Sequence, residues 1–183
     1  MTSRRALDDE EITAALERGG PETTADGLPV VSTSHDIETP VGRVRVQETV
    51  GRGAWARAPR RAALMLPGPV AIGSFHRIPV PGYDAATVLD AEGFACVTVD
   101  LVVTGDSEHP EDGRTCSIGR QVEALEGVIE ALRELRGYAP MAAIGESWGG
   151  AIASHLAAKP ALVSACVISS ALFRTSTPAV DQM

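Results

Sequence analysis

The feature that most constrains this chain is a short apolar run that ends in Gly-x-Ser-x-Gly at residues 145–149. A segment rich in helix-forming residues, 151–159, follows the motif. This order predicts a strand, a sharp turn with Ser147 at its apex, and a helix. A serine hydroxyl becomes a useful nucleophile when such a turn holds it clear of its neighbours, next to a base and an oxyanion site. The motif glycines leave room for the turn, and Gly150 lets the helix pack close to the strand.

The rest of the chain alternates predicted strands with predicted helices. Near-continuous apolar strands separated by helices are typical of a mostly parallel sheet covered on both faces. An antiparallel hairpin at 36–50 precedes them, because polar and apolar residues alternate there on both sides of a Pro-Val-Gly turn. The sequence therefore predicts an α/β fold, with further strands at 61–66, 94–99, 141–144 and 162–169, and helices at 83–92, 118–136 and 151–159.

The clearest helix is 118–136, which Gly137 closes. Apolar residues at helical spacing predict its buried face. They run from Ile118 through Val122, Leu125, Val128, Ile129 and Leu132 to Leu135. In the helix at 83–92, the inward residues are expected to be Ala86, Val88 and Leu89.

The N-terminal region is predicted to stand apart from this sheet. Residues 8–18 form a short capped helix, expected to lie on the surface as an arm or to bind a partner. Residues 20–34 are rich in Gly, Pro, Thr and Ser, which predicts a linker. We therefore expect an arm at 1–34, an α/β domain at 35–174, and a loop at 175–183 where a lid insertion or a truncation point falls.

Composition excludes several classes of function. The net charge of −8 argues against nucleic-acid binding, which needs clustered Lys and Arg. No apolar run approaches the ~20 residues of a membrane span, and the charged start has no signal-peptide core. The three cysteines lack metal-ligand spacing, and no Gly-rich phosphate loop occurs. These observations predict a cytoplasmic protein with a small-molecule substrate, no metal, no cofactor and no membrane or nucleic-acid partner.

From Asp36 to Ser169 the chain resembles the α/β-hydrolase family. The hairpin looks like that family's first two strands, and 64–68 looks like the third strand with its His-Gly turn, here Pro-Gly. Residues 100–107 are similar to the family's Asp-x-Arg-Gly-x-Gly-x-Ser loop, and 145–149 match its nucleophile elbow. The resemblance implies an α/β-hydrolase-like fold whose C-terminal part is missing from this chain.

The resemblance also implies an active site around the elbow. Ser147 would be the nucleophile, and the backbone N–H of Trp148 would be one donor of the oxyanion hole. The family's second donor follows Gly68, where this chain has Pro69. Proline has no N–H, so Val70 would donate after a shift of one residue.

The resemblance places the histidine and acid of the triad after later strands, beyond the last predicted one. A C-terminal fragment or a second chain would then complete the fold. Within the chain, His76 and His109 are candidates for a base or a substrate contact, and Asp181 is a candidate acid. His35 and His155 are expected to be remote from the elbow or to point away from it.

Two further acids have structural interpretations. Asp100, at the end of the strand 94–99, resembles the family's loop-fixing acid. It is not expected to belong to a triad. Glu146, beside the serine, could be a general acid, but it is expected to hold the elbow by hydrogen bonds.

Three functions fit these observations. The leading hypothesis is a serine hydrolase or acyl-transfer enzyme that acts on an ester, thioester or related carbonyl of a small organic molecule. A lyase of the same fold, carrying out an elimination in secondary metabolism on a polyketide-like substrate, is an alternative, because His76 or a missing histidine could abstract a proton. A truncated, non-catalytic binding module is the third, and exposed apolar surface where later strands should pair would be its mark.

Overall fold

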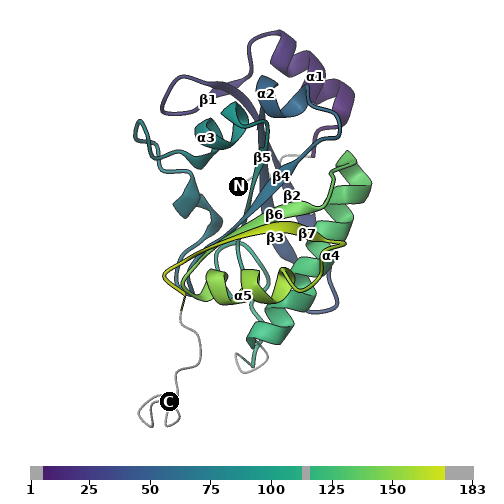
Figure 1. Cartoon of the computed structure of the whole chain (residues 1–183), viewed down its shortest axis with the longest axis vertical. Helices are drawn as coiled ribbons and strands as arrows, with labels where there is room; N and C mark the ends of the chain where they lie inside the picture. Colours follow the sequence, from purple (N-terminus) through teal and green to yellow (C-terminus); the bar gives the residue numbers. More distant parts are fainter. Residues whose placement is uncertain (1–5, 113–115, 172–183) are drawn as a thin grey trace.

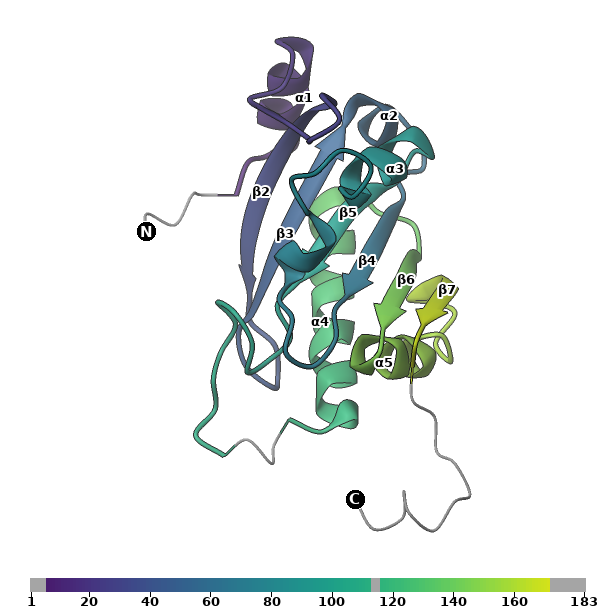
Figure 2. The same ribbon diagram turned by 90° about the vertical axis from the view of Figure 1, so that its left-hand side faces the viewer.

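The computed structural model describes residues 6–112 and 116–171, which form a seven-stranded mixed sheet with helices on both faces (Figure 1). The order across the sheet is β1-β2-β3-β5-β4-β6-β7, and Figure 2 shows β2 to β7 side by side in this order. Strands β5, β4, β6 and β7 are parallel to one another, whereas the β1–β2, β2–β3 and β3–β5 pairs are antiparallel. The strands are β1 Glu22–Thr23, β2 Pro29–Ile37, β3 Val44–Gly51, β4 Ala62–Leu66, β5 Ala95–Val99, β6 Met141–Glu146 and β7 Val163–Ser169.

Helices cover the central strands on both faces, which confirms the predicted fold class. Figure 2 shows α3 in front of the sheet and α4 behind it. Every residue of β4 and β5 is buried as a result. Alternate residues of β4 face different cores: Leu64 belongs to the large core on the side of α4 and α5, and Met65 to a smaller one beside α3. The helices are α1 Asp9–Glu17, α2 Arg52–Trp55, η1 Gly73–His76 (a 3₁₀ turn), α3 Ala85–Ala91, α4 Ile118–Arg136 and α5 Trp148–Leu156.

The predicted linker is wrong, because part of it belongs to the sheet. Strand β2 begins at Pro29, and Val30 and Val31 pair with the end of β3. The predicted hairpin is therefore confirmed but longer than expected. Residues 29–34 become a strand because β3 continues as far as Gly51 and offers them backbone partners, which their own composition does not reveal.

The short N-terminal helix is confirmed, but it is not a surface arm. Helix α1 begins with a capping box between Asp8 and Glu11. Its apolar side chains, Ile12 and Leu16, are buried in the large core. Helix α1 is thus part of the packed structure, and none of the described helices is long and apolar enough to cross a membrane.

Two apolar residues that were predicted to face inward are exposed. Val88 of α3 is 60% exposed, and Leu135 of α4 is 49% exposed. In each helix a charged residue takes the inward place. Asp90 accepts hydrogen bonds from the backbone of α2, and Arg136 reaches a carboxylate inside the core.

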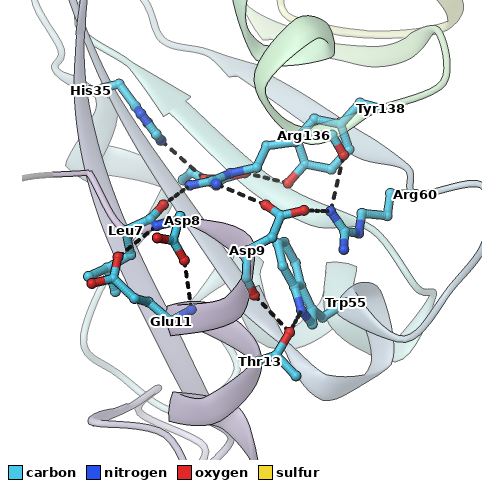
Figure 3. Close-up of polar contacts among 11 residues, drawn as sticks. Leu7, Asp8, Asp9, Glu11, Thr13, His35, Trp55, Arg60, Arg136 and Tyr138 are labelled. Atoms are coloured by element: carbon cyan, nitrogen blue, oxygen red, sulfur yellow. Dashed lines mark hydrogen bonds and ion pairs between the residues drawn. The ribbon is translucent and has the colours of Figure 1, made fainter.

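That carboxylate belongs to Glu48, which lies on the same face of β3 as the inward valines. It accepts hydrogen bonds from Tyr138 Oη at 2.5 Å and from Arg136 Nε at 3.0 Å, and His35 Nε2 lies 3.1 Å away. Arg136 also forms an ion pair with Asp9 at 3.0 Å. Figure 3 shows how these side chains join α1 to the end of α4 and to the hairpin.

The buried cluster keeps Glu48 ionised. Burial by itself would raise the pKa of this carboxyl group, but the His35 hydrogen bond, the Arg136 charge and the Tyr138 hydrogen bond outweigh burial. The pKa of Glu48 therefore lies below its ordinary value. In turn, burial and the Glu48 carboxylate raise the pKa of Tyr138, so its hydroxyl remains a donor.

We predict that Arg136→Met lowers the free energy of unfolding by about 3–5 kcal/mol at pH 7, because it leaves the Glu48 charge buried without its guanidinium partner. The measurement is urea denaturation, with Arg120→Met as the control. Arg120 lies on the same helix in an exposed i,i+3 pair with Glu123, so its loss should cost less than about 0.5 kcal/mol.

The same variant has a predicted pH dependence. Without Arg136 the pKa of Glu48 rises in the folded state, so the carboxyl group takes up a proton as the pH falls towards its ordinary pKa of 4.5. Protonation removes from the variant a buried charge that has lost its guanidinium partner, whereas the wild type loses the contribution of Glu48 to stability as the pH falls through 4.5 and below. The stability gap should therefore narrow on acidification, and a gap that widens would contradict the assigned role of Glu48.

Candidate active site

Ser147 lies at a strained turn between β6 and α5. Its φ is +52° and its ψ is −113°, an uncommon conformation for a residue with a side chain. Such a conformation costs about 1–3 kcal/mol and persists only where its surroundings enforce it. The Ser147 N–H donates to the carbonyl of Ser169 at 2.9 Å, which holds the turn against the end of β7.

Glycines allow the close approach that this turn requires. A Cβ atom on Gly145 would lie 2.6 Å from the backbone nitrogen of Gly150, and one on Gly149 would lie 2.6 Å from the carbonyl oxygen of Pro67. A Cβ on Gly150 would lie 3.0 Å from Cγ2 of Ile168 in β7. The predicted strand, sharp turn and close-packed helix are therefore confirmed.

The turn after β4 lies against the serine. A Cβ on Gly68 would be 3.7 Å from Cβ of Ser147. The turn closes with a hydrogen bond from the N–H of Ala71 to the carbonyl of Gly68 at 3.2 Å, with Pro69 and Val70 in its middle. Both middle residues are exposed, and Val70 is the one that has an N–H.

Trp148 is the first residue of α5 and is half-buried against the large core. The first four N–H groups of a helix have no acceptor within the helix. The N–H of Trp148 is one of these groups, and the positive end of the helix dipole lies at the same place. The start of α5 can therefore stabilise a negative charge that develops beside Ser147.

Three of the four histidines lie outside this arrangement. His35 is buried within β2, in the Glu48 cluster, and does not precede the first strand as the sequence suggested. His109 is exposed in the loop after β5, where its Nε2 lies 3.2 Å from the carbonyl oxygen of Gly105. His155 is exposed on α5. No hydrogen bond joins any of these side chains to Ser147 within the described structure.

His76, in contrast, is the last residue of η1, and its imidazole is affected by the charge of Glu146, the residue before Ser147. It is half-buried, and burial lowers the pKa of its imidazole, while the negative charge of Glu146 partly opposes this shift.

Glu146 immediately precedes Ser147 at the end of β6 and follows Ala142 and Ile144 on one face of that strand. Its expected hydrogen bonds to the elbow do not occur among the described residues. The two-residue alternation of β6 is the sequence signal that places Glu146 on the face where η1 packs.

Asp100 fixes the loops around His76, as its position suggested. Its Oδ1 accepts a hydrogen bond from the N–H of Gly73 at 2.7 Å, and its Oδ2 accepts one from Asp106 at 2.9 Å. The carboxylate also fills the space where a Cβ of Gly105 would lie. Asp100 thereby ties η1 and the loop after β5 to the end of that strand.

The remaining candidates add no further group to the site. Asp181 lies outside the described residues. Cys166 is half-buried, because β7 lies at the edge of the described sheet. Within the part of the chain that the structure describes, no group of three or more His, Cys, Asp or Glu residues could hold a metal ion.

A serine on a strained turn between a parallel strand and a helix is typical of one class of α/β proteins. Comparisons with known proteins identify that class. A family model described as alpha/beta hydrolase fold matches residues 76–182. The chain belongs to the α/β-hydrolase fold family. No curated protein matches its sequence.

Solved structures agree on the fold. An epoxide hydrolase from Vigna radiata is 22% identical with a TM-score of 0.62, over 81% of this chain and 41% of that protein. An alpha/beta hydrolase from Novosphingobium aromaticivorans is 25% identical with a TM-score of 0.53, over 80% of this chain and 41% of that one. An esterase from Exiguobacterium antarcticum is 20% identical with a TM-score of 0.59, over 76% and 46%. The chain thus matches less than half the length of each protein.

We predict that Gly149→Ala destabilises the protein by about 3 kcal/mol, because the new methyl group meets the backbone at the end of β4 and neither segment can easily move. Gly119→Ala is the matched control. Gly119 is also in a helix, but the nearest atom to its added Cβ would be 3.9 Å away, so the change should stay within about 1 kcal/mol. Thermal unfolding measures the stability of both variants. Equal losses of stability would contradict the close approach of α5 to the end of β4.

Proposed function

We propose that the protein is a serine hydrolase or acyl-transfer enzyme that acts on an ester, thioester or related carbonyl of a small organic molecule through Ser147. The observation that carries this proposal is the conformation of Ser147, at positive φ between β6 and the start of α5. A strained residue with a reactive side chain at such a turn is typical of a nucleophile. Membership of the α/β-hydrolase fold family supports the fold, whereas the reaction has to be tested by experiment.

In the proposed reaction, Ser147 Oγ attacks the carbonyl carbon while a base takes its proton. The carbonyl oxygen becomes an oxyanion, which accepts hydrogen bonds from the N–H groups of Trp148 and Val70. Loss of one such donor typically costs about 10²–10³ in rate, so the proposed reaction depends on Val70 donating in place of Pro69, which has no N–H. The acyl-enzyme then passes its acyl group to water or to another acceptor.

The base and the triad acid would come from polypeptide beyond β7, either a C-terminal part or a second chain. Strand β7 is the edge of the described sheet, and Val167 and Ile168 are 56% and 40% exposed. The strand contains no charged residue and no proline, which are the usual means of blocking an edge from pairing. A further strand could therefore add to this edge and bring a histidine to Ser147.

The same edge favours a second candidate function. An apolar, unblocked strand could bind another polypeptide without any catalysis, and Ser147 would then be an unused residue. Labelling of the serine discriminates between the two functions, because a binding module needs no activated nucleophile.

A different measurement separates hydrolysis from the elimination that a lyase of the same fold would catalyse. Hydrolysis in labelled water puts the label into the product, whereas elimination does not.

We predict that a fluorophosphonate probe adds one adduct to the natural protein at Ser147, and that Ser147→Ala loses both the adduct and ester turnover. Ser154→Ala is the control, because Ser154 lies on α5 but donates its hydroxyl to the carbonyl of Ala151. Intact mass before and after labelling also shows whether the natural species exceeds 19.1 kDa or includes a second chain. An unlabelled species of 19.1 kDa would reject the nucleophile and favour the binding module.

A further inference from the structure

The face of the sheet on which α3 packs is covered at β4 and open at β7. Met65 of β4, Ile144 of β6 and Val167 of β7 are partners in register, so their side chains form one row across this face. Met65 is 6% exposed, Ile144 is half-buried and Val167 is 56% exposed. The neighbouring row changes from buried to exposed in the same order: Ala63, Ala142 and Ala165. The cover over this face therefore ends at β6.

Helix α3 supplies that cover. The smaller core combines Ala86 of α3 with residues of β4 and β5, and two residues of β6 lie at its margin. Within the described structure no residue of β7 belongs to this core. The apolar residues that α3 leaves uncovered or partly covered are here called the open face, and they are Ala142, Ile144, Ala165 and Val167.

Val88 of α3 lies on the flank of the helix that is nearest to the open face. Ala85, Ala86 and Leu89 face the smaller core. Asp90 is about 160° from Val88 around the helix, and it accepts hydrogen bonds from the backbone of α2, which directly follows β3. Asp90 therefore marks the flank towards β3, and Val88 marks the flank towards β6 and β7. The 60% exposure of Val88 adds to the same apolar surface.

The spacing of helices and strands makes the open face one helix wide. Helices that pack side by side lie about 8–10 Å apart, and neighbouring strands lie about 4.7–4.9 Å apart. A helix beside α3 would therefore be displaced by about two strands. Because α3 packs on β4 and β5, the next position on this face is over β6 and β7, with Val88 at its side.

The handedness of the connections limits where such a helix can come from. Helix α3 connects β4 to β5, whereas α4 and α5 lie on the other face and connect strands in the opposite direction across the sheet. This arrangement follows the right-handed rule for parallel strands. A further parallel strand beyond β7 would thus bring its crossover helix to the face of α5. A helix on the open face must come from another segment, such as one that follows the last added strand.

We propose that the open face binds an amphipathic α-helix from polypeptide outside residues 1–183, which packs beside α3 with its apolar stripe on Ile144, Val167 and Val88. The chain spans less than half the length of the matching solved structures, so proteins of this fold contain enough further polypeptide for such a helix. Exposed apolar surface of this kind marks an interaction site. The proposal goes beyond the proposed reaction, because it requires no activity of Ser147. It also differs from strand addition at β7, which pairs the backbone of the edge and leaves Val88 exposed.

The test compares the thiol labelling of three variants of the full natural protein: Val88→Cys, Val167→Cys and the control Leu135→Cys. The three native side chains are exposed to similar extents, 60%, 56% and 49%, but Leu135 lies on α4, on the opposite face of the sheet. Cys116 and Cys166, which are half-buried, are replaced by serine in each variant. Each rate of reaction with a maleimide is divided by the rate for the same variant in urea. We expect Val88→Cys and Val167→Cys to react at least about tenfold more slowly than Leu135→Cys.

Two labelling results would overturn the proposal. Equal rates for the three variants would mean that nothing covers the open face. Protection of Val167→Cys alone would mean that a strand has joined the edge of β7 without a helix over the face.

Cross-linking identifies the cover. A photoreactive diazirine residue takes the place of Val88 in the natural protein, and mass spectrometry locates its products. Cross-links to a segment outside residues 1–183, at positions three or four apart, would support the helix. Cross-links within residues 1–183, in the same or another copy of the chain, or at alternate positions of a strand, would overturn it.

Discussion

The approach of α5 to the end of β4 is the contact on which the rest of the site depends. At Gly149 the backbone of the helix comes so close to the Pro67 carbonyl that no side chain fits between them. This packing forces the chain to turn sharply at Ser147, which takes a positive φ that an isolated peptide would avoid. The strain is balanced by ordinary interactions elsewhere: the parallel pairing of β6 with β4 and β7, the hydrogen bond to Ser169 and the burial of α5. The serine is thereby presented at the carboxyl edge of the sheet together with the first N–H groups of the helix.

A second set of interactions stabilises the other end of the molecule. In Figures 1 and 2, α1 lies at one end and α5 towards the other. The Glu48 carboxylate lies in the core near α1, where Arg136, Tyr138 and His35 hold its charge. An ion pair between Arg136 and Asp9 extends this cluster to α1. Buried charges are costly unless every partner is in place. The cluster therefore makes the position of α1 depend on the end of α4 and on the hairpin, well away from the reactive serine.

The carboxyl edge combines rigid and open features. Asp100 and Arg77 fix the loops that carry His76, and the glycines fix the elbow. Strand β7, in contrast, has no strand on its outer side among the described residues, and its apolar side chains are exposed there. A rigid nucleophile next to an open sheet edge is consistent with a site that becomes complete when further polypeptide joins β7. Because the rigid serine and the open strand edge are separate features, the nucleophile and the binding of further polypeptide must be tested separately.

The sequence by itself determined the elements whose signals are local. The bounds of α4 agree with the apolar spacing from 118 to 136, and the strand, turn and helix around Ser147 follow from the order of apolar residues and glycines. Only the tertiary structure decided which side chains of these elements meet. Arg136, and not Leu135, turns inward because Glu48, 88 residues earlier, needs a cation. Residues 29–34 become a strand because β3 pairs with them, and Glu146 acts on His76 because η1 folds back over the sheet. Helical spacing and turn residues are encoded within a few positions, whereas charge partners and strand partners come from distant segments that meet only in the folded chain.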